Sequence, residues 1–365
     1  MDRRSFLATA ATLPLASITS TSAQAQERTF APRPGAWRSF EVTTRVEVAG
    51  AGPGTQVWIP VPVVDGDWQQ TMGATWSGNM RSAALVTEPV YGAKMVHATF
   101  ADTEPTPVVE VVSRFRARDR AYDWSAAPAT LAAPADLGAY LRATELMPTD
   151  GIVKATAERI VAGRTTDADK VRALYEWVVA NTHREPKVRG CGTGDIKAML
   201  ETGNMGGKCG DINALFVGLA RSVGVPARDV YGIRVAKSAF GYRELGAGSP
   251  DISKAQHCRA EVWLAGRGWV AMDPADVGKV MRLETAEWLR DPNSPVAAPV
   301  YRALFGGWEG NGMADNVAHD VALPGSKGAK VGFLMYPQAE TRGERVDSLD
   351  PDTFKYRITA REIVG

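Results

Sequence analysis

The hydrophobic pattern divides the chain into a β-patterned first third and a largely helical middle. Residues 40–48 (FEVTTRVEV) alternate between apolar and polar positions, residues 55–63 do the same, and residues 108–112 form a short β-branched run. Such alternation is typical of strands with one buried face. Glycines and a proline within 50–54 separate the first two runs. We therefore predict a small antiparallel sandwich or barrel over residues 37–125.

Helical periodicity takes over from about residue 137. Apolar residues recur at three- and four-residue intervals after Asp150 and after Thr166, and each of these residues can cap a helix. A short helix is predicted from Asp195, and a longer one from Cys209 to about residue 223, with a glycine at 224 as its stop. Strands are then predicted at 229–235, 257–264 and 268–272.

The first 25 residues have the features of an export signal. The twin arginines of RRSFL at 3–7 precede an apolar stretch, and AQA at 23–25 is a small-residue cleavage site. We predict a twin-arginine signal peptide cleaved near Ala25 and a periplasmic or secreted mature protein. An ordinary secretory signal and a frayed N-terminal arm are the alternatives. No later segment has the roughly 18 unbroken apolar residues that a membrane span needs.

Composition excludes some classes of partner. The 42 Lys and Arg nearly balance the 41 Asp and Glu, so the net charge is +1, and no field of one sign favours nucleic acid or an anionic membrane.

The chain has 3 cysteines, which are too few for a disulfide scaffold. Because the number is odd, at least one thiol is free or pairs between chains. A Cys191–Cys258 disulfide that leaves Cys209 free is one arrangement that the sequence allows.

Three short segments carry residues suited to nucleophilic catalysis. The segment GGKCGD places Cys209 at the expected start of a helix, where free N–H groups and the helix dipole favour a thiolate. QHCRAEVW carries His257 at the start of a strand, and GWVAMDP carries Asp273 at the end of the next. A thiol nucleophile, a general base and a carboxylate that orients the base make a Cys-His-Asp triad. Taken singly, a buried cysteine or a structural histidine is an equally ordinary interpretation.

The length of one hairpin loop decides whether Asp273 reaches His257. A two-residue turn would place Asp273 opposite Ala260, on the wrong face of the sheet. A three-residue loop at 265–267, followed by a left-handed glycine, places Asp273 opposite Arg259 and diagonal to His257, within side-chain reach. We therefore predict the three-residue loop.

The same segments resemble a known family. GKCGD with the helix 212–221 and GVPAR at 224–228 resembles the nucleophile block of the transglutaminase-like superfamily, and HCRAEVW and GWVAMDP resemble its His and Asp blocks. The resemblance covers roughly residues 150–285, less than half of the chain. Two positions depart from the commonest pattern: Cys258 stands where alanine is frequent, and Ala275 stands where threonine is common. Neither departure touches the proposed chemistry.

The resemblance implies an α+β fold with a papain- or transglutaminase-like core, in which the nucleophile helix packs on an antiparallel sheet. An N-terminal β-sandwich-like domain would precede it. The expected parts of the chain are a signal peptide at 1–25, a linker at 26–36, a β-rich N-terminal domain at 37–125, a transglutaminase-like catalytic domain at 137–290 and a C-terminal mixed or β extension at 291–365.

By the same resemblance, the protein would be an exported cysteine enzyme that acts on amide bonds through a thioester acyl-enzyme. Hydrolysis, as a peptidase or amidase, is the favoured reaction. The alternatives are transglutaminase-type acyl transfer to an amine and a non-catalytic binding or scaffold protein of the cell envelope. The expected partner is a protein, peptide or peptidoglycan-peptide substrate.

Four further positions are candidates for an oxyanion hole or substrate groove. N–H groups at the helix start, including that of Gly210, could stabilise an oxyanion, and Lys208 adds a cation beside the thiol. Related enzymes use a side-chain donor upstream of the nucleophile, a role that the indole of Trp177 could fill, although its helical stripe position favours core packing. Trp263 could line a groove, but cross-strand packing is the simpler interpretation.

No metal or cofactor is predicted. Cys191, Cys209, His257 and Cys258 make a Cys₃His set on paper, but the sequence has no C-x₂-C or H-x₃-H pair. Neighbouring residues of a strand, such as His257 and Cys258, also point to opposite faces. Calcium-loop and cofactor motifs are absent from the sequence as well.

Overall fold

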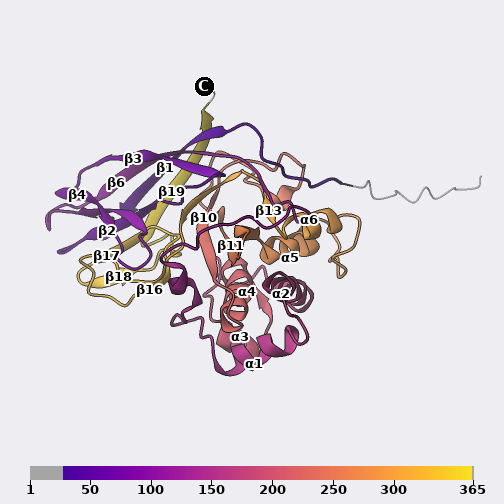
Figure 1. Cartoon of the computed structure of the whole chain (residues 1–365). Coiled ribbons are helices and arrows are strands. Elements are labelled where there is room, and N and C mark those ends of the chain that lie inside the picture. The colour runs from indigo at the N-terminus through magenta and orange to yellow at the C-terminus, as the bar shows by residue number, and fades with distance from the viewer. Residues whose placement is uncertain (1–27, 364–365) are drawn as a thin grey trace, which may run out of the picture.

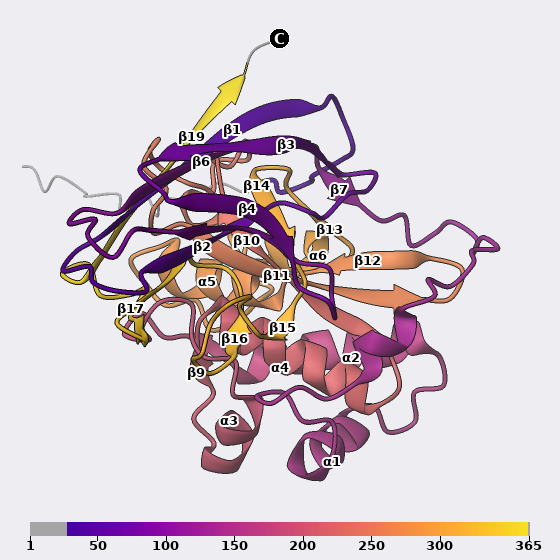
Figure 2. The same ribbon diagram turned by 90° about the vertical axis from the view of Figure 1, so that its left-hand side faces the viewer.

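The computed structural model describes residues 28–363. The predicted signal peptide at 1–25 lies outside the described residues. The chain folds into a β-sandwich that packs against an α+β core, with the helices gathered on the side away from the sandwich (Figures 1 and 2). No helix in the described part of the chain is both long and apolar enough to cross a membrane.

Two antiparallel sheets form the sandwich, which settles the choice between sandwich and barrel. One has the order β19-β1-β6-β3, with bounds Phe354–Ile363, Arg38–Val48, Val108–Ala117 and Gln69–Gly78. The other has the order β18-β17-β2-β5-β4, with bounds Glu344–Val346, Gln338–Thr341, Gln56–Val61, Lys94–Thr99 and Ser82–Thr87. Apolar residues of both sheets, such as Val46 and Ile59, share one buried cluster. The alternating pattern of the sequence therefore marks the inner faces of the sandwich.

The α+β core is a four-stranded antiparallel sheet covered by helices. The sheet has the order β12-β11-β10-β14, with bounds Gly268–Met272, Gln256–Leu264, Ala227–Arg234 and Gly312–Asn316. Helices α1, α2, α3 and α4 span Gly151–Ile160, Asp167–Asn181, Ile196–Thr202 and Cys209–Ser222. Helix α4 is buried from Cys209 to Arg221 and packs on β10 and β11. It is the central helix that the apolar pattern predicted.

Shorter elements connect these layers. Two helices follow the sheet, α5 at Pro274–Leu283 and α6 at Ala298–Ala303. The remaining elements are β7 (Arg120–Ala121), η1 (Leu137–Leu141), β8 (His183–Arg184), β9 (Gly206–Gly207), η2 (Arg243–Leu245), β13 (Gly307–Trp308), β15 (His319–Val321) and β16 (Val331–Phe333). Strand β9 lies immediately before α4, and its parallel pairing with β8 fixes the backbone that leads into the helix.

The C-terminal residues complete both layers and form no sheet of their own apart from the short β15–β16 pair. Strand β14 pairs with β10 in the core sheet, β19 pairs with β1 over ten positions, and β17 pairs with β2. Figure 1 shows β19, in yellow, lying along β1, in indigo. The described part of the segment that the sequence suggests as a C-terminal extension, residues 291–363, is therefore structurally part of the layers that precede it.

The hairpin between β11 and β12 has the predicted register. Leu264 pairs with Gly268, so the loop has three residues, and Gly268 has a positive φ of 75°. Extending this register by one pair from Ala260 and Met272 places Asp273 opposite Arg259. The prediction of the three-residue loop is confirmed.

Candidate active site

Cys209 is the first residue of α4, and the backbone around it is fixed by a buried carboxylate. Asp211, in the first turn of the helix, accepts a hydrogen bond from the N–H of Lys208 at 2.9 Å. It also accepts from the N–H groups of Thr193 at 2.9 Å and Gly194 at 3.0 Å. The carboxylate ties the preceding loop to the helix start and complements the positive end of the helix dipole.

His257 is oriented by Asp273. Its Nε2 lies 2.7 Å from Oδ2 of Asp273, and both side chains are buried. The other carboxylate oxygen of Asp273 accepts from the N–H of Asp276 at 3.1 Å and caps α5. Because one oxygen caps the helix, the other is held toward the imidazole. The Nδ1 of His257 is therefore the ring nitrogen that can exchange a proton with another group.

Asn213 connects the nucleophile helix to this pair. One turn after Cys209, its buried amide donates to the carbonyl of Cys258 at 2.8 Å and to Oδ1 of Asp273 at 3.3 Å. Its oxygen accepts from the N–H of Ala275 at 3.2 Å. A single side chain thus fixes α4 relative to β11 and to the start of α5.

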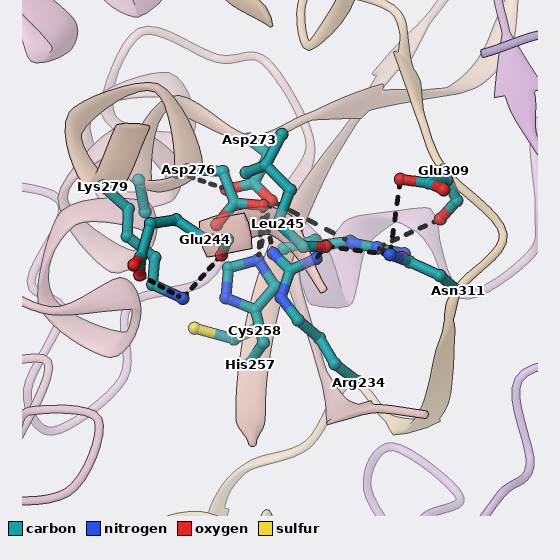
Figure 3. A network of polar contacts seen from close by, with 12 residues as sticks. Arg234, Glu244, Leu245, His257, Cys258, Asp273, Asp276, Lys279, Glu309 and Asn311 are labelled. Carbon is teal, nitrogen blue, oxygen red and sulfur yellow. Dashed lines mark hydrogen bonds and ion pairs between the residues drawn. The ribbon is translucent and has the colours of Figure 1, made fainter. Parts of the chain in front are cut away.

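A second carboxylate, Asp276, and the guanidinium of Arg234 lie beside the pair (Figure 3), and Arg259 contacts it as well. Asp276 Oδ2 lies 3.4 Å from Nε2 of His257 and forms a buried ion pair with Arg234. The guanidinium of Arg259 comes within 4.0 Å of Asp273 and donates to the Glu309 carbonyl at 3.1 Å. These contacts offset the cost of burying two carboxylates and an imidazole.

Burial and charge set the protonation of these groups. Burial lowers the pKa of His257, but Asp276 and Asp273 outweigh it, so the pKa is raised above 6.5. Burial also raises the pKa of Asp276, yet the Arg234 guanidinium holds that pKa well below its usual range. The pKa of Asp273 is raised by its burial and by the neighbouring charge of Asp276. The surroundings as a whole therefore favour an imidazolium.

The thiol of Cys209 differs from the other two thiols. All three cysteines are free and buried, so the Cys191–Cys258 disulfide that the sequence allows does not form in this structure. Hydrogen bonds from Cys191 and Cys258, together with His257, lower the pKa of Cys209 well below 9.0 despite its burial. The same contacts and burial raise the pKa of both neighbouring thiols. Cys209 is therefore the thiol favoured to ionise.

Cys209 and His257 line the same cavity. This cavity, of about 280 Å³, is called the catalytic cavity below. A second cavity of about 470 Å³, the side cavity, is lined by Cys191 and Lys208. The two share lining residues, among them Arg184, so they are parts of one groove. The groove gives a substrate access to the thiol and the imidazole together.

The N–H groups at the helix start, which the sequence suggests as oxyanion donors, differ in their availability. The N–H of Gly210 donates to the carbonyl of Cys191 at 2.8 Å and so is already occupied. Within residues 28–363 the N–H of Cys209 itself has no backbone acceptor. A carbonyl carbon attacked by the thiol would place its oxygen beside this free N–H group.

The two candidate tryptophans line neither cavity. Trp177 is partly buried against the hydrophobic core on α2 and lines neither cavity. Trp263 pairs across the β11–β12 hairpin with Trp269, with ring centroids 5.7 Å apart, at the end of β11 opposite to His257. Trp177 thus packs against the core and Trp263 packs across the hairpin, which are the simpler interpretations given for them above. Lys208, by contrast, borders the groove.

One cluster has the spacing of metal ligands. Ligand atoms of His257, Asp273 and Asp276 lie within 4.8 Å of one another, and all three residues are buried. However, Asp276 is paired with Arg234, and Asp273 is engaged by the imidazole. A divalent cation would have to displace a buried guanidinium, so this donor set fits an ion-pair network better than a metal centre.

Sequence reasoning missed three residues of this site. Arg234, Asn213 and Asp276 all contact the His257–Asp273 pair or its partners. A signal for α5 was present, because Asp273 precedes a proline, and this order is typical of an N-cap followed by the first residue of a helix. A helix beginning there would have placed Asp276 in its first turn, close to the cap. No local pattern marks Arg234 or Asn213.

Comparison with known proteins agrees with this architecture. The model of the transglutaminase-like superfamily matches residues 154–274. An uncharacterized protein of Haemophilus influenzae is 36% identical over 325 residues, covering 85% of this chain and 86% of the relative.

One solved structure resembles the fold, and a second is matched at a lower score. A candidate cysteine protease from Cytophaga hutchinsonii has a TM-score of 0.50 at 12% identity, covering 90% of this chain and 99% of that one. The periplasmic domain of TgpA from Pseudomonas aeruginosa has a TM-score of 0.33 at 16% identity, covering 72% and 93%. With the matched segment containing Cys209, His257 and Asp273, the chain belongs to the transglutaminase-like superfamily.

Proposed function

We propose that this protein is a cysteine enzyme that cleaves amide bonds, with Cys209 as nucleophile, His257 as general base and acid, and Asp273 as the residue that orients the imidazole. The observation that carries the proposal is the placement of Cys209 at a helix start, in the same cavity as a histidine held by a buried carboxylate. Groups arranged in this way are suited to nucleophilic catalysis.

The proposed reaction has two halves. The Cys209 thiolate attacks the amide carbonyl carbon, and the N–H of Cys209 stabilises the resulting oxyanion. His257, carrying the thiol proton, gives it to the leaving amine as the C–N bond breaks and a thioester remains. Water then attacks the thioester while His257 accepts its proton, and the thiol is restored as the acid product leaves.

The electrostatics support this division of roles. A lowered pKa for Cys209 and a raised pKa for His257 favour a thiolate–imidazolium pair at neutral pH. In that state the thiol proton already resides on the imidazole before substrate binds. Asp273 and Asp276 supply the negative charge that stabilises the imidazolium.

Hydrolysis is the favoured outcome, and acyl transfer to an amine is the alternative. The two differ only in the molecule that attacks the thioester. A non-catalytic envelope protein would retain the fold and bind peptides without turnover. We further propose that the protein acts outside the cytoplasm, on the basis of the twin-arginine pattern at 3–7 and the AQA segment at 23–25. Its substrate would then be a protein, a peptide or a peptidoglycan peptide.

Product analysis of the purified protein with peptide and cell-wall peptide libraries, with and without a labelled primary amine, tests the proposal. We expect new carboxyl termini without label; incorporation of the amine would instead identify an acyltransferase. Cys209→Ala and His257→Ala should each abolish turnover while leaving the circular dichroism spectrum unchanged. Turnover that survives Cys209→Ala would refute the assignment of the nucleophile.

A further inference from the structure

Almost all of the charged side chains that line the groove beside Cys209 are cationic. Arg184 and Lys254 line both the catalytic and the side cavity, and Lys208 and Lys355 line the side cavity. The side cavity has no acidic lining residue among those described. Asp251 is the acidic residue on the wall of the catalytic cavity, and it is paired with an arginine at 3.1 Å.

Some cations of the groove already have acidic partners. Arg189 lies 2.6 Å from Asp347, and Lys279 lies 3.5 Å from Glu244. In contrast, within residues 28–363 no carboxylate lies within ion-pairing distance of Arg184, Lys208 or Lys254. The uncompensated positive charge is therefore concentrated on the wall next to the nucleophile.

Arg184 is the best placed of these cations. It lies on β8, which pairs with β9 so that Arg184 is opposite Gly207, two residues before Cys209. Its Nε is buried and has no hydrogen-bond partner in the described part of the chain. A buried guanidinium N–H without an acceptor is unfavourable, and a carboxylate is an acceptor that the geometry of a guanidinium suits well. The position and the unmet donor both point to an anionic ligand.

Lys208 supports the same interpretation. It is the N-cap residue of α4, directly before Cys209, and it is half-buried. Burial and the nearby charge of Arg184 lower the pKa of Lys208. A bound anion would relieve the repulsion between these two cations.

We propose that Arg184, Lys208 and Lys254 form a subsite that binds a carboxylate of the substrate, so that acidic peptides are preferred. The claim that the bound peptide is then cleaved rests on the proposed function, but the binding preference does not. Two peptide carboxylates have the required chemistry: the side chain of Glu or Asp, and the free C-terminus. Phosphate also pairs with a guanidinium, but a carboxylate is the anion that an unmodified peptide carries into a groove walled in addition by Phe354 and Tyr356.

Binding to the Cys209→Ala protein separates this proposal from the catalytic one. Calorimetry would compare three acetylated hexapeptides: one with a single Glu and an amidated C-terminus, its Gln counterpart, and the Gln peptide with a free C-terminal carboxylate. We expect at least one carboxylate peptide to bind about tenfold more tightly than the neutral peptide, and the advantage to shrink as salt rises. Tighter binding of the Glu peptide identifies the side chain as the source of the carboxylate, and tighter binding of the peptide with the free C-terminus identifies the terminus. Equal affinity for all three peptides would overturn the proposal, whether or not the active enzyme turns over.

Two subsite variants and one control complete the test. Lys254→Gln, at an exposed position, and Arg184→Gln should each remove most of the carboxylate preference, whereas Lys330→Gln, exposed and outside both cavities, should keep it. If both subsite variants keep the preference, the subsite is not where we place it. In the active enzyme, Arg184→Gln should raise KM for the acidic peptide alone; an equal loss of kcat for acidic and neutral peptides would make Arg184 an oxyanion donor and would refute its role here.

Discussion

At the scale of single residues, burial alone does not distinguish the reactive thiol, because Cys191, Cys209 and Cys258 are all buried. What distinguishes Cys209 is its hydrogen-bond donors. Its position at the start of α4 adds the field of the helix. Burial and their contacts with Cys209 raise the pKa of the other two thiols, so these thiols are favoured to stay neutral. A cysteine that appears incidental in the sequence thus contributes to the ionisation of another.

This arrangement predicts an unusual pH dependence of alkylation. With the pKa of Cys209 held well below 9.0, iodoacetamide should modify it at pH 6.5 nearly as fast as at pH 8.5. An ordinary thiol would slow by about 50-fold over that range. Cys191→Ala should move the profile toward higher pH because it removes the first of the donors, whereas Cys191→Ser keeps an O–H donor and should preserve it. Mass spectrometry of the Cys209 peptide gives the rates, and a profile centred near pH 8.5 in the unmodified protein would contradict the model of a stabilised thiolate.

A second prediction concerns Asp276, which sequence analysis did not identify. Among the charges that raise the pKa of His257, Asp276 has the largest effect. Asp276→Asn should therefore lower that pKa, so the alkaline limb of kcat/KM, where the imidazolium is lost, moves to lower pH. The change also leaves Arg234 buried without its partner, at a cost of about 3–5 kcal/mol in unfolding free energy.

The sign of the stability effect follows from the direction of the Asp276 shift. The pKa of Asp276 is depressed in the folded protein. Its contribution to the free energy of unfolding is therefore present above pH 3.8, the pKa in the unfolded chain, and is lost as the pH falls below that value. Stability of the wild type and of Asp276→Asn should therefore differ at pH 7 and converge in acid. Asp251→Asn is the control, since that half-exposed carboxylate should change unfolding free energy by less than about 1 kcal/mol. Urea denaturation at several pH values measures both variants.

At the scale of elements, the start of α4 depends on a loop that closes over Asp211. Gly192 has a φ of 92°, and a Cβ there would come within 1.9 Å of an Asp211 carboxylate oxygen. Only glycine therefore allows the loop to approach closely enough for the N–H groups of Thr193 and Gly194 to reach the carboxylate. The loop and the nucleophile helix form one structural unit.

Two glycine variants test this dependence. Gly203 also has a positive φ, of 69°, but nothing lies within 4 Å of a Cβ built there. Gly203→Ala should therefore cost only the backbone strain of about 1–2 kcal/mol. Gly192→Ala should cost that amount and, in addition, about 1–3 kcal/mol for each hydrogen bond to Asp211 that breaks. Thermal unfolding of both variants measures the difference, and equal losses would show that the loop does not depend on close approach to the carboxylate.

The elements that were predictable from sequence are those with a local signal. The caps at Thr166 and Asp195, and the left-handed glycine that follows α3, all lie where the pattern indicates. The hairpin loop before Gly268 was predictable because only one register brings Asp273 to the face of His257. By contrast, β14 has no alternating pattern, because all of its residues are buried on both faces. Its pairing with β10 depends on residues far away in the chain, which no local pattern records.

At the scale of the whole molecule, the structural core around the candidate site extends beyond the segment that matches the family. The matched segment ends at 274, yet the core sheet is completed by β14, and the main buried cluster includes Leu304, Phe305 and Trp308. The side cavity is walled by Phe354 and Tyr356 of β19, a strand of the sandwich. The groove therefore depends on chain segments from both ends of the sequence.

This dependence predicts that residues 137–290 will not fold alone. Without β14, strand β10 would lose its partner at Tyr231–Arg234 and become an unpaired edge strand of the core sheet. Without α6 and the residues after it, large aromatic side chains such as Trp308, which is 1% exposed, would no longer cover the core. Burying one such side chain contributes about 1.5–3 kcal/mol, so losing several exceeds the net stability of a typical domain. A fragment of residues 28–363 should unfold cooperatively and alkylate at Cys209 below pH 7, whereas 137–290 should be insoluble or lack a cooperative transition. Cooperative unfolding of the shorter fragment, with a reactive Cys209, would show that the sandwich and the C-terminal strands are dispensable for the site.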